Sequence, residues 1–341
     1  MIVSGSDDKT VRLWREPKKL FNFRDVGNLR LILEVLKFLS AEEVMGIARV
    51  NRQFYEASFH SEVLKPVFRQ ASILEGHTDF VNSVAVSLEK GILVSASQDS
   101  TIRVWSLATA QVTQVLKGHS DWVWSVAISS DGEWVVSGSD DETLRVWSLA
   151  SGLTTLVLKG HSSGVRSLAI SSKDQFIVSC SYDTTLRLWS LTTGEVIRVL
   201  RGHSDEVNSV AISKTDQYIV SGSDDCSVRV WSLTSGEVTR VLQGHGGVVF
   251  SVAISNDDQF VVSGSYDKTI RVWSLTSGET TQVLRGHDGI VLSIKLSSDD
   301  KYLVSGGGYP DNSVRIWDLS TGLQTQELKG HTNDVWSVNL I

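Results

Sequence analysis

The sequence predicts an all-β protein: a seven-bladed β-propeller closed by the two termini, with a small all-α insert. Three observations predict this fold. The dipeptide Gly-His recurs at a nearly constant interval, each interval holds four short strand-like runs, and the two ends of the chain carry complementary parts of one further interval. The predicted division assigns residues 1–14 to the second and third strands of the closing blade, residues 15–71 to the helical insert, and residues 72–341 to the rest of the propeller.

The internal repeat is the primary signal. The histidines of the Gly-His pairs stand at positions 77, 119, 161, 203, 245, 287 and 331, so the first five intervals are 42 residues and the sixth is 44. Within residues 118–159, the runs "WVWSVAIS", "EWVVSGS", "TLRVWSL" and "TTLVLK" are separated by turn residues. We name these strands a, b, c and d, from innermost to outermost. Four strands at this period are typical of a propeller blade and argue against a helical solenoid.

The ends of the chain complete a seventh unit. The last twelve residues, "GHTNDVWSVNLI", supply a Gly-His turn and strand a, whereas residues 1–14, "MIVSGSDDKTVRLW", supply strands b and c. Strand d is expected at "SILEG", from Ser72. Together these segments leave no open sheet edge at the seam. The alternative is a truncated gene model whose full product begins with further repeats, but the halves are complementary rather than overlapping, which favours closure.

Every unit carries a His after Gly, a Ser in strand b, an Asp in the b–c turn and a Trp in strand c. The indole N–H can only donate a hydrogen bond and the carboxylate can only accept one, whereas Ser and neutral His can do both. A chain from Trp through Ser and His to Asp therefore gives each donor an acceptor, and it ties strands b and c to the d–a turn. The predicted tetrads are His77, Ser95, Asp99 and Trp105; His119, Ser137, Asp141 and Trp147; His161, Ser179, Asp183 and Trp189; His203, Ser221, Asp225 and Trp231; His245, Ser263, Asp267 and Trp273; His287, Ser305, Asp311 and Trp317; and His331, Ser4, Asp8 and Trp14.

Ser, His and Asp are also the parts of a hydrolase triad. Because the set recurs seven times and nothing marks one copy as special, we interpret the tetrads as structural. No catalytic residue, metal site or cofactor is predicted, since no unique constellation of nucleophile, base or metal ligands stands out.

Composition narrows the range of functions and cellular locations that we expect for the chain. The net charge of −7 gives no basic signal for nucleic acid or an acidic membrane surface. Cys180 and Cys226 are too few for a disulfide framework and are interpreted as spectators. The N-terminus lacks a signal-peptide pattern, and no apolar run approaches membrane-spanning length. We expect a cytoplasmic protein, or one that is also nuclear.

On these motifs the repeats resemble the WD-repeat family, the β-propellers related to the heterotrimeric G-protein β subunit. The resemblance covers residues 1–14 and about 72–341, and it implies the same tetrad network. The family's Trp-Asp pair survives only at Trp317-Asp318, with Trp-Ser in five units and Trp14-Arg15 at the start. The sixth unit, "SGGGYPDNSVRIW", has two extra residues in its b–c turn, which is either a tolerated insertion or a protrusion that contacts a partner.

The segment 15–71 has a different character. Its run "NLRLILEVLKFL" places apolar side chains on one helical face, and Ser40 with Glu43 forms a capping-box signal for a second helix. Residues 15–70 hold 10 Lys and Arg against 7 Asp and Glu, a charge of +3 within a chain of −7. These features predict a separate helical module.

Read as one unit, "LILEVLKFLSAEEVMGIARVNRQFYEASFHSEVL" resembles an F-box. It departs where the family's Leu-Pro pair would fall, at Gly27-Asn28, and where a Trp would fall, at Leu64. The resemblance implies binding to a Skp-type linker subunit of a cullin ubiquitin ligase, and the alternative is a helical insertion that only decorates the propeller. The expected linker-binding residues are Leu31, Ile32, Val35, Leu36, Phe38, Leu39, Val50 and Phe54.

Large aromatic residues and one arginine occupy variable positions of the repeats near the Gly-His turns. If these positions had no function, we would expect polar residues there. Aromatic residues and Arg are typical of protein-recognition surfaces. The alternative, strongest for the two tryptophans on strand a, is packing between blades. The candidate partner-binding residues are Phe80, Trp122, Trp124, Arg166, Tyr182, Phe250, Tyr266 and Trp336.

The sequence therefore predicts a non-catalytic protein-interaction module. In the favoured interpretation it is a substrate-recognition adaptor for a cullin-type ubiquitin ligase, in which the propeller captures a target and the insert recruits the linker subunit. The alternative is a general WD-repeat scaffold with no ubiquitin-ligase role.

Overall fold

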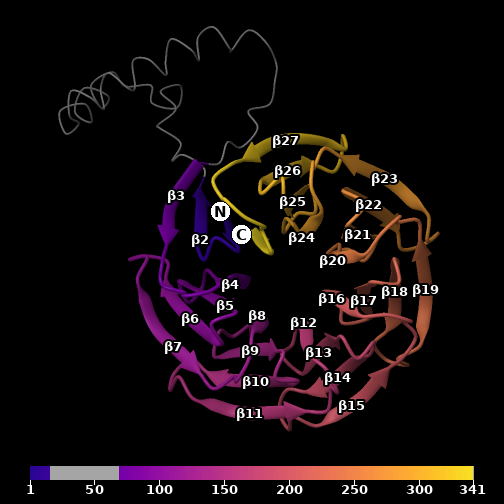
Figure 1. Ribbon diagram of the computed structural model, residues 1–341. Coiled ribbons are helices and arrows are strands. Elements are labelled where there is room, and N and C mark those ends of the chain that lie inside the picture. Colours follow the sequence, from indigo (N-terminus) through magenta and orange to yellow (C-terminus); the bar gives the residue numbers. More distant parts are fainter. Residues whose placement is uncertain (16–68, 341) are drawn as a thin grey trace, which may run out of the picture. The chain divides into compact units, whose positions relative to one another are not determined.

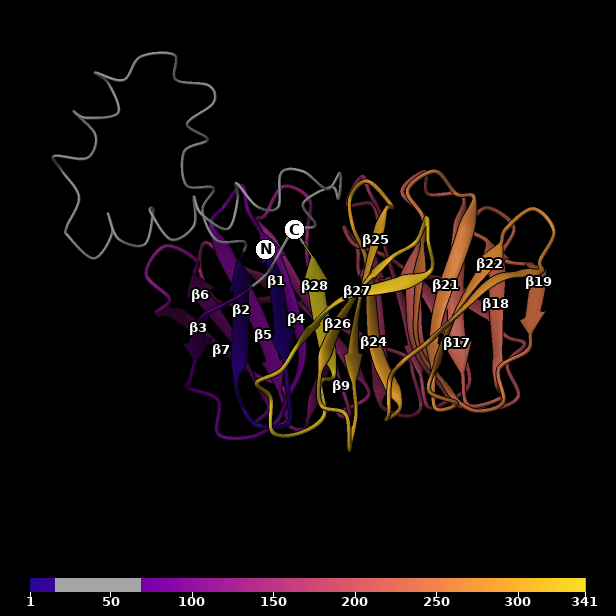
Figure 2. The ribbon, with the colours of Figure 1, turned by 90° about the horizontal axis from the view of Figure 1, so that it is seen from above.

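The computed structural model describes residues 1–15 and 69–340, and these residues form a seven-bladed propeller (Figure 1). Seven antiparallel sheets of four strands stand around a central channel, with strand a of each sheet innermost (Figures 1 and 2). The predicted all-β propeller is confirmed. The predicted helical insert falls almost entirely on residues 16–68, outside the described residues. Internal contacts divide the chain into Met1–Arg15 with Gln70–Ile341 as one unit and Glu16–Arg69 as the other.

Six blades are built from consecutive strands, in the order a, b, c, d. Blade 1 has β4 (Val81–Ser87), β5 (Ile92–Ser97), β6 (Thr101–Ser106) and β7 (Val112–Lys117). Blade 2 has β8 (Val123–Ile128), β9 (Trp134–Ser139), β10 (Thr143–Ser148) and β11 (Thr154–Lys159). Blade 3 has β12 (Val165–Ile170), β13 (Phe176–Ser181), β14 (Leu186–Ser190) and β15 (Val196–Leu200). Blade 4 has β16 (Val207–Ile212), β17 (Tyr218–Ser223), β18 (Ser227–Ser232) and β19 (Val238–Gln243). Blade 5 has β20 (Val249–Ile254), β21 (Phe260–Ser265), β22 (Thr269–Ser274) and β23 (Thr280–Arg285). Blade 6 has β24 (Val291–Leu296), β25 (Tyr302–Gly307), β26 (Val314–Asp318) and β27 (Leu323–Leu328).

The seventh blade, here called the seam blade, joins both ends of the chain. Its strands lie in the order β28 (Ser337–Leu340), β1 (Ile2–Gly5), β2 (Val11–Arg15) and β3 (Arg69–Leu74). Strand β28 pairs antiparallel with β1, from Gly5 opposite Ser337 to Ile2 opposite Leu340. The inner edge of β1 is therefore hydrogen-bonded, as the complementary ends of the sequence predicted.

The hydrophobic core lies between neighbouring blades. In one cluster, Val94 and Leu116 of blade 1 pack with Val123, Val135 and the tetrad residue Trp147 of blade 2. Strand b is buried on both faces, as the pattern of "WVVSGS" in β9 shows, because a blade covers it on each side. The tetrad tryptophans of blades 1 to 6 are thus held by hydrogen bonds in their own blade and by apolar contacts with the preceding blade.

Strand a carries a β-bulge at its second residue in blades 1 to 6. In blade 2, for example, Val123 pairs with Ser139 and Ser125 with Gly138, so that Trp124 between them has no partner in the ladder. A bulge leaves the extra residue unpaired and re-aims its side chain. The bulged residues of all six blades line a cavity at the Gly-His end of the channel.

Candidate protein-docking face

The tetrads form hydrogen-bonded chains in all seven blades. Each Trp Nε1 donates to the Ser Oγ at 2.7–3.1 Å, and the Ser Oγ lies 2.6–2.8 Å from the His Nε2. The His Nδ1 lies 2.7–2.9 Å from the Asp Oδ2 in six blades, and His287 bonds Asp311 in the same way. With Trp donating to Ser, the serine hydroxyl donates to His and the Nδ1–H donates to Asp.

Electrostatics support this assignment of donors. Burial alone would raise the pKa of Asp141, but hydrogen bonds from His119 and Thr143 outweigh it and hold that pKa well below its ordinary range. The same balance lowers the pKa of Asp267 to about 2. Burial lowers the pKa of His245, which favours the neutral imidazole that the chain requires.

Burial favours the structural interpretation of the tetrads over the hydrolytic one. Ser137 is 0% exposed, and so is the serine of every other tetrad. A nucleophile must reach the substrate, and these hydroxyls contact neither solvent nor a cavity. Their geometry fits a brace that joins strands b and c to the d–a turn.

Four of the candidate partner-binding residues meet at the Gly-His end of the channel, and we call them the mouth cluster: Trp122, Trp124, Arg166 and Trp336. The guanidinium carbon of Arg166 lies 3.6 Å from the centre of the Trp124 ring and 4.9 Å from that of Trp336. The two indoles are 6.0 Å apart, edge to face, and Trp122 lies 5.8 Å from Trp124. Trp122 is 44% exposed, so the cluster reaches from the channel to the outer surface.

The cluster forms because blade 1, between the seam blade and blade 2, has a small residue at this position. Asn82 is buried there, and its side-chain amide donates to the carbonyl of Val123 at 3.0 Å. This leaves room for Trp124 and Trp336 to meet across the intervening blade. The indole N–H of Trp124 is fixed by Asp140, whose Oδ1 it bonds at 2.7 Å.

The other candidates lie elsewhere on or near this face. Tyr182 is half-buried, with its ring centre 5.7 Å from the Arg166 guanidinium carbon. Phe250 lines the small cavity together with Trp124, Arg166 and Trp336. Tyr266 is 59% exposed on blade 5, and Phe80 is half-buried on blade 1. The described ring contacts join neither of these two to the mouth cluster.

The structure adds residues to this end of the channel that the sequence analysis did not single out. Asn82, Asn208 and Leu292 occupy the bulged position in their blades and line the small cavity. The sequence could have identified these three residues by position, because each lies five residues after the histidine of its unit. The aromatic search passed over them because they are not aromatic.

Acidic residues surround the mouth cluster. Burial raises the pKa of Asp7 to about 6, with further upward contributions from Asp334 and Asp79, while the nearby indole of Trp336 works in the opposite direction. Burial likewise raises the pKa of Asp140, and the nearby Asp121 adds to the shift. These carboxylates are close enough to repel one another, so the Gly-His face favours a cationic neighbour.

The enlarged b–c turn of blade 6 lies on the same face. Gly308 N donates to Ile290 O at 2.8 Å, and Tyr309 N donates to Asp334 Oδ1 of the seam blade at 2.5 Å. The Tyr309 side chain is 77% exposed. The insertion is therefore anchored to a neighbouring blade, and both the tolerated-insertion and the partner-contact interpretations stay open.

The remaining predictions concern the linker-binding residues of the insert, metal ligands and membrane-spanning segments. The eight expected linker-binding residues, from Leu31 to Phe54, lie outside the described residues. Within the described ranges, no group of three or more His, Cys, Asp or Glu could hold a metal ion. In that same part of the chain, no helix is long and apolar enough to cross a membrane.

Comparison with known families agrees with the geometry. The family model WD40, described as WD domain, G-beta repeat, matches residues 1–15, 68–106, 110–148, 152–190, 194–232, 236–274 and 278–318. Each of the six longer matches takes strand d of one blade and strands a, b and c of the next, so the sequence repeat and the structural blade are offset by one strand. With its repeats matched over most of the chain and its blades closed in a ring, this chain belongs to the WD40 family.

Proposed function

We propose that the chain is a non-catalytic adaptor whose Gly-His face captures a protein. WD40 propellers generally serve as protein-interaction scaffolds. The observation that carries the proposal is the mouth cluster, in which the exposed Trp122 contacts Trp124, and Arg166 lies over the rings of Trp124 and Trp336. A rigid aromatic group with an embedded arginine has the composition of a binding hot spot.

The charge around this cluster indicates the chemistry of the partner. Asp7 and Asp140 have raised pKa values, and neighbouring carboxylates contribute to both shifts. A partner segment carrying Lys or Arg relieves this repulsion, whereas an acidic or phosphorylated segment increases it. We therefore propose a basic segment as the part of the partner that docks here.

The test is quantitative affinity capture with the parent chain, Trp122→Ala and Leu153→Ala as a matched control. Leu153 is also an exposed apolar side chain, at 68%, but it lies in the c–d turn of blade 2, at the opposite end of the strands. Proteins that dock on the Gly-His face should be depleted with Trp122→Ala and retained with Leu153→Ala. Equal capture by all three forms contradicts the proposal.

We further propose that residues 15–71 recruit a Skp-type linker subunit of a cullin ubiquitin ligase. The support is the F-box-like pattern of the segment and its place in the c–d connection of the seam blade, between β2 and β3. Connections of this kind leave the propeller at the end opposite the Gly-His turns.

This division of roles is tested by replacing residues 16–68 with a short Asn-Gly turn, since β2 and β3 are neighbouring strands. The shortened protein should melt cooperatively, keep the captured target and lose a linker subunit that co-purifies with the parent. If linker binding is unchanged, or if the parent binds none, the ubiquitin-ligase role is excluded and the general scaffold remains.

A further inference from the structure

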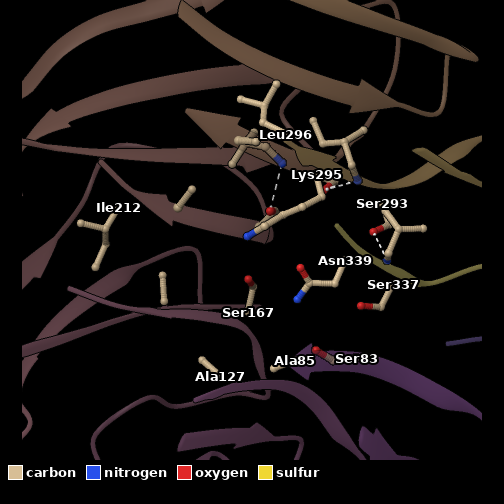
Figure 3. Close-up of a pocket in the computed structure, with 18 of the residues that line it drawn as sticks. Ser83, Ala85, Ala127, Ser167, Ile212, Ser293, Lys295, Leu296, Ser337 and Asn339 are labelled. Atoms are coloured by element: carbon tan, nitrogen blue, oxygen red, sulfur yellow. Dashed lines mark hydrogen bonds between the residues drawn. The ribbon is translucent and has the colours of Figure 1, made fainter. Parts of the chain in front are cut away.

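The central channel contains a cavity of about 640 Å³, lined by the inner strands of all seven blades and extending to the a–b turns (Figure 3). This volume is in the range of small-molecule sites. It lies beyond the small cavity at the mouth cluster, toward the other end of the channel. The two cavities adjoin at a ring of serines that lines both, and the larger cavity lies on the side of that ring away from the proposed docking surface.

The charge of this lining is opposite to that of the chain. The described residues that line this cavity include Lys214 and Lys295 but neither Asp nor Glu, and the nearest carboxylates, Asp216 and Asp300, bond its lining residues Ser172 and Asn256 at the a–b turns. The whole chain, in contrast, carries a net charge of −7. A positively charged, carboxylate-free lumen within an acidic protein selects for anions.

Lys295 is the central feature of the cavity. Eight residues after the histidine of each unit, strand a has alanine in blades 1 to 5, Lys295 in blade 6 and Asn339 in the seam blade. Both side chains project into the same cavity (Figure 3), and solvent in the lumen reaches Lys295. The surrounding protein nevertheless desolvates its ammonium group and lowers its pKa.

No ion pair joins Lys295 to a described carboxylate, and burial of its ammonium group lowers its pKa. An ammonium that loses hydration without gaining an ionic partner is unfavourable. An anion in the cavity would supply that partner.

A ring of serine hydroxyls adds donors at the next level of the channel. Six residues after the histidine of each unit, strand a has a serine, and the Oγ of this serine accepts the backbone N–H of strand a in the next blade. The seven bonds, 2.9–3.4 Å long, run from Val84 to Ser337, Val126 to Ser83, Leu168 to Ser125, Val210 to Ser167, Val252 to Ser209, Ile294 to Ser251 and Val338 to Ser293.

These bonds use a lone pair of each oxygen and leave its hydrogen unused. None of the seven hydroxyls donates to an acceptor among the described residues, and all seven serines line the cavity. The lumen therefore offers hydroxyl, amide and ammonium donors together, which suits a ligand with several acceptor oxygens.

We propose that the channel binds an oxyanion of the phosphate class through Lys295, Asn339 and the serine ring. The ligand is either free inorganic phosphate or a small phosphomonoester, because the volume accommodates both. Its negative charge neutralises Lys295, and its oxygens accept from the hydroxyls and from the Asn339 amide.

The test is calorimetric titration of the full chain with inorganic phosphate and, separately, with glycerol 3-phosphate, at constant ionic strength. The key variant is Lys295→Ala, which installs the residue that five other blades carry and should therefore fold. The control is Lys301→Ala, whose side chain is 73% exposed and paired only with Asp299 among the described ion pairs.

Lys295→Ala should weaken phosphate binding by at least roughly tenfold, whereas Lys301→Ala should leave it nearly unchanged. In phosphate-free buffer, Lys295→Ala should melt no lower than the parent, because an unpaired charge has been removed. Tighter binding of the phosphomonoester would identify an organic phosphate as the ligand, and equal or weaker binding would identify the free ion. Equal affinity of the parent and Lys295→Ala, or no binding by the parent at about 10 mM ligand, overturns the proposal.

Discussion

Removing one hydroxyl from a tetrad tests whether these chains stabilise the propeller. In blade 2, Ser137 is fully buried; it accepts the indole N–H of Trp147 at 2.8 Å and bonds His119 Nε2 at 2.7 Å. Ser137→Ala leaves both of these buried groups without a partner, and each unsatisfied group costs about 1–3 kcal/mol. The free energy of unfolding should therefore fall by about 2–5 kcal/mol.

The assay is urea unfolding followed by circular dichroism, with Ser151→Ala as the control. Ser151 is exposed and accepts one long bond, from Leu153 N at 3.3 Å, so its removal should cost less than about 0.5 kcal/mol. Combining Ser137→Ala with Trp147→Phe should cost about 1–2 kcal/mol less than the sum of the single changes, because the unpaired indole N–H is then also gone. A Ser137→Ala midpoint equal to that of Ser151→Ala would refute this account of the tetrads.

Three further changes test the seam, the blade contacts and the acidic face. Deleting residues 337–341 removes the partner of β1 and should abolish a single cooperative melting transition, whereas Ser151→Ala should melt like the parent. Gly138→Ala should lower the free energy of unfolding by about 1–3 kcal/mol, because a Cβ there would lie 2.7 Å from Val165 Cγ1 in the next blade. An unchanged urea midpoint would show that the two blades can move apart without loss of stability. Asp7→Asn should raise stability by about 1–3 kcal/mol above pH 6. The pKa of Asp7 is about 6 in the folded protein, against an ordinary value of 3.8. Ionised Asp7 therefore lowers the free energy of unfolding above about pH 6, and this destabilisation disappears as the pH falls toward 4. Melting curves of both forms at pH 4 and pH 7.5 measure the difference, and a gain that is larger at pH 4 would contradict it.

The repeat and the tetrads were accessible from the sequence because they depend on local contacts. A hairpin joins residues that are near in the chain, and His119 lies 22 positions from Asp141 and 18 from Ser137. Donor and acceptor types then allow one consistent order of bonds. The seam blade was predictable from the same pattern. His331 and Asp8, at opposite ends of the chain, form the His–Asp bond that the other six units form within one repeat.

The mouth cluster and the lumen depend instead on contacts across the ring. Trp124 and Trp336 belong to blades that are not neighbours, and they meet because the bulges turn strand a into the channel and Asn82 leaves space between them. The periodicity assigned each of these residues to a blade but could not give the width of the channel. Sequence alone therefore named the aromatic candidates without showing which of them touch.

Lys295 is the sharpest example of this division. In the sequence it is one of 32 basic residues, at a position on strand a where five other units have alanine. Whether a lysine there is solvated, paired or isolated depends on what the other six blades bring to the axis, and they bring serines and alanines without a carboxylate. The sequence by itself determined the strands, their order and the hydrogen-bonded braces, because these are settled within one repeat. Only the tertiary structure decided the environment on the channel axis, because charge and solvation there result from all seven blades together.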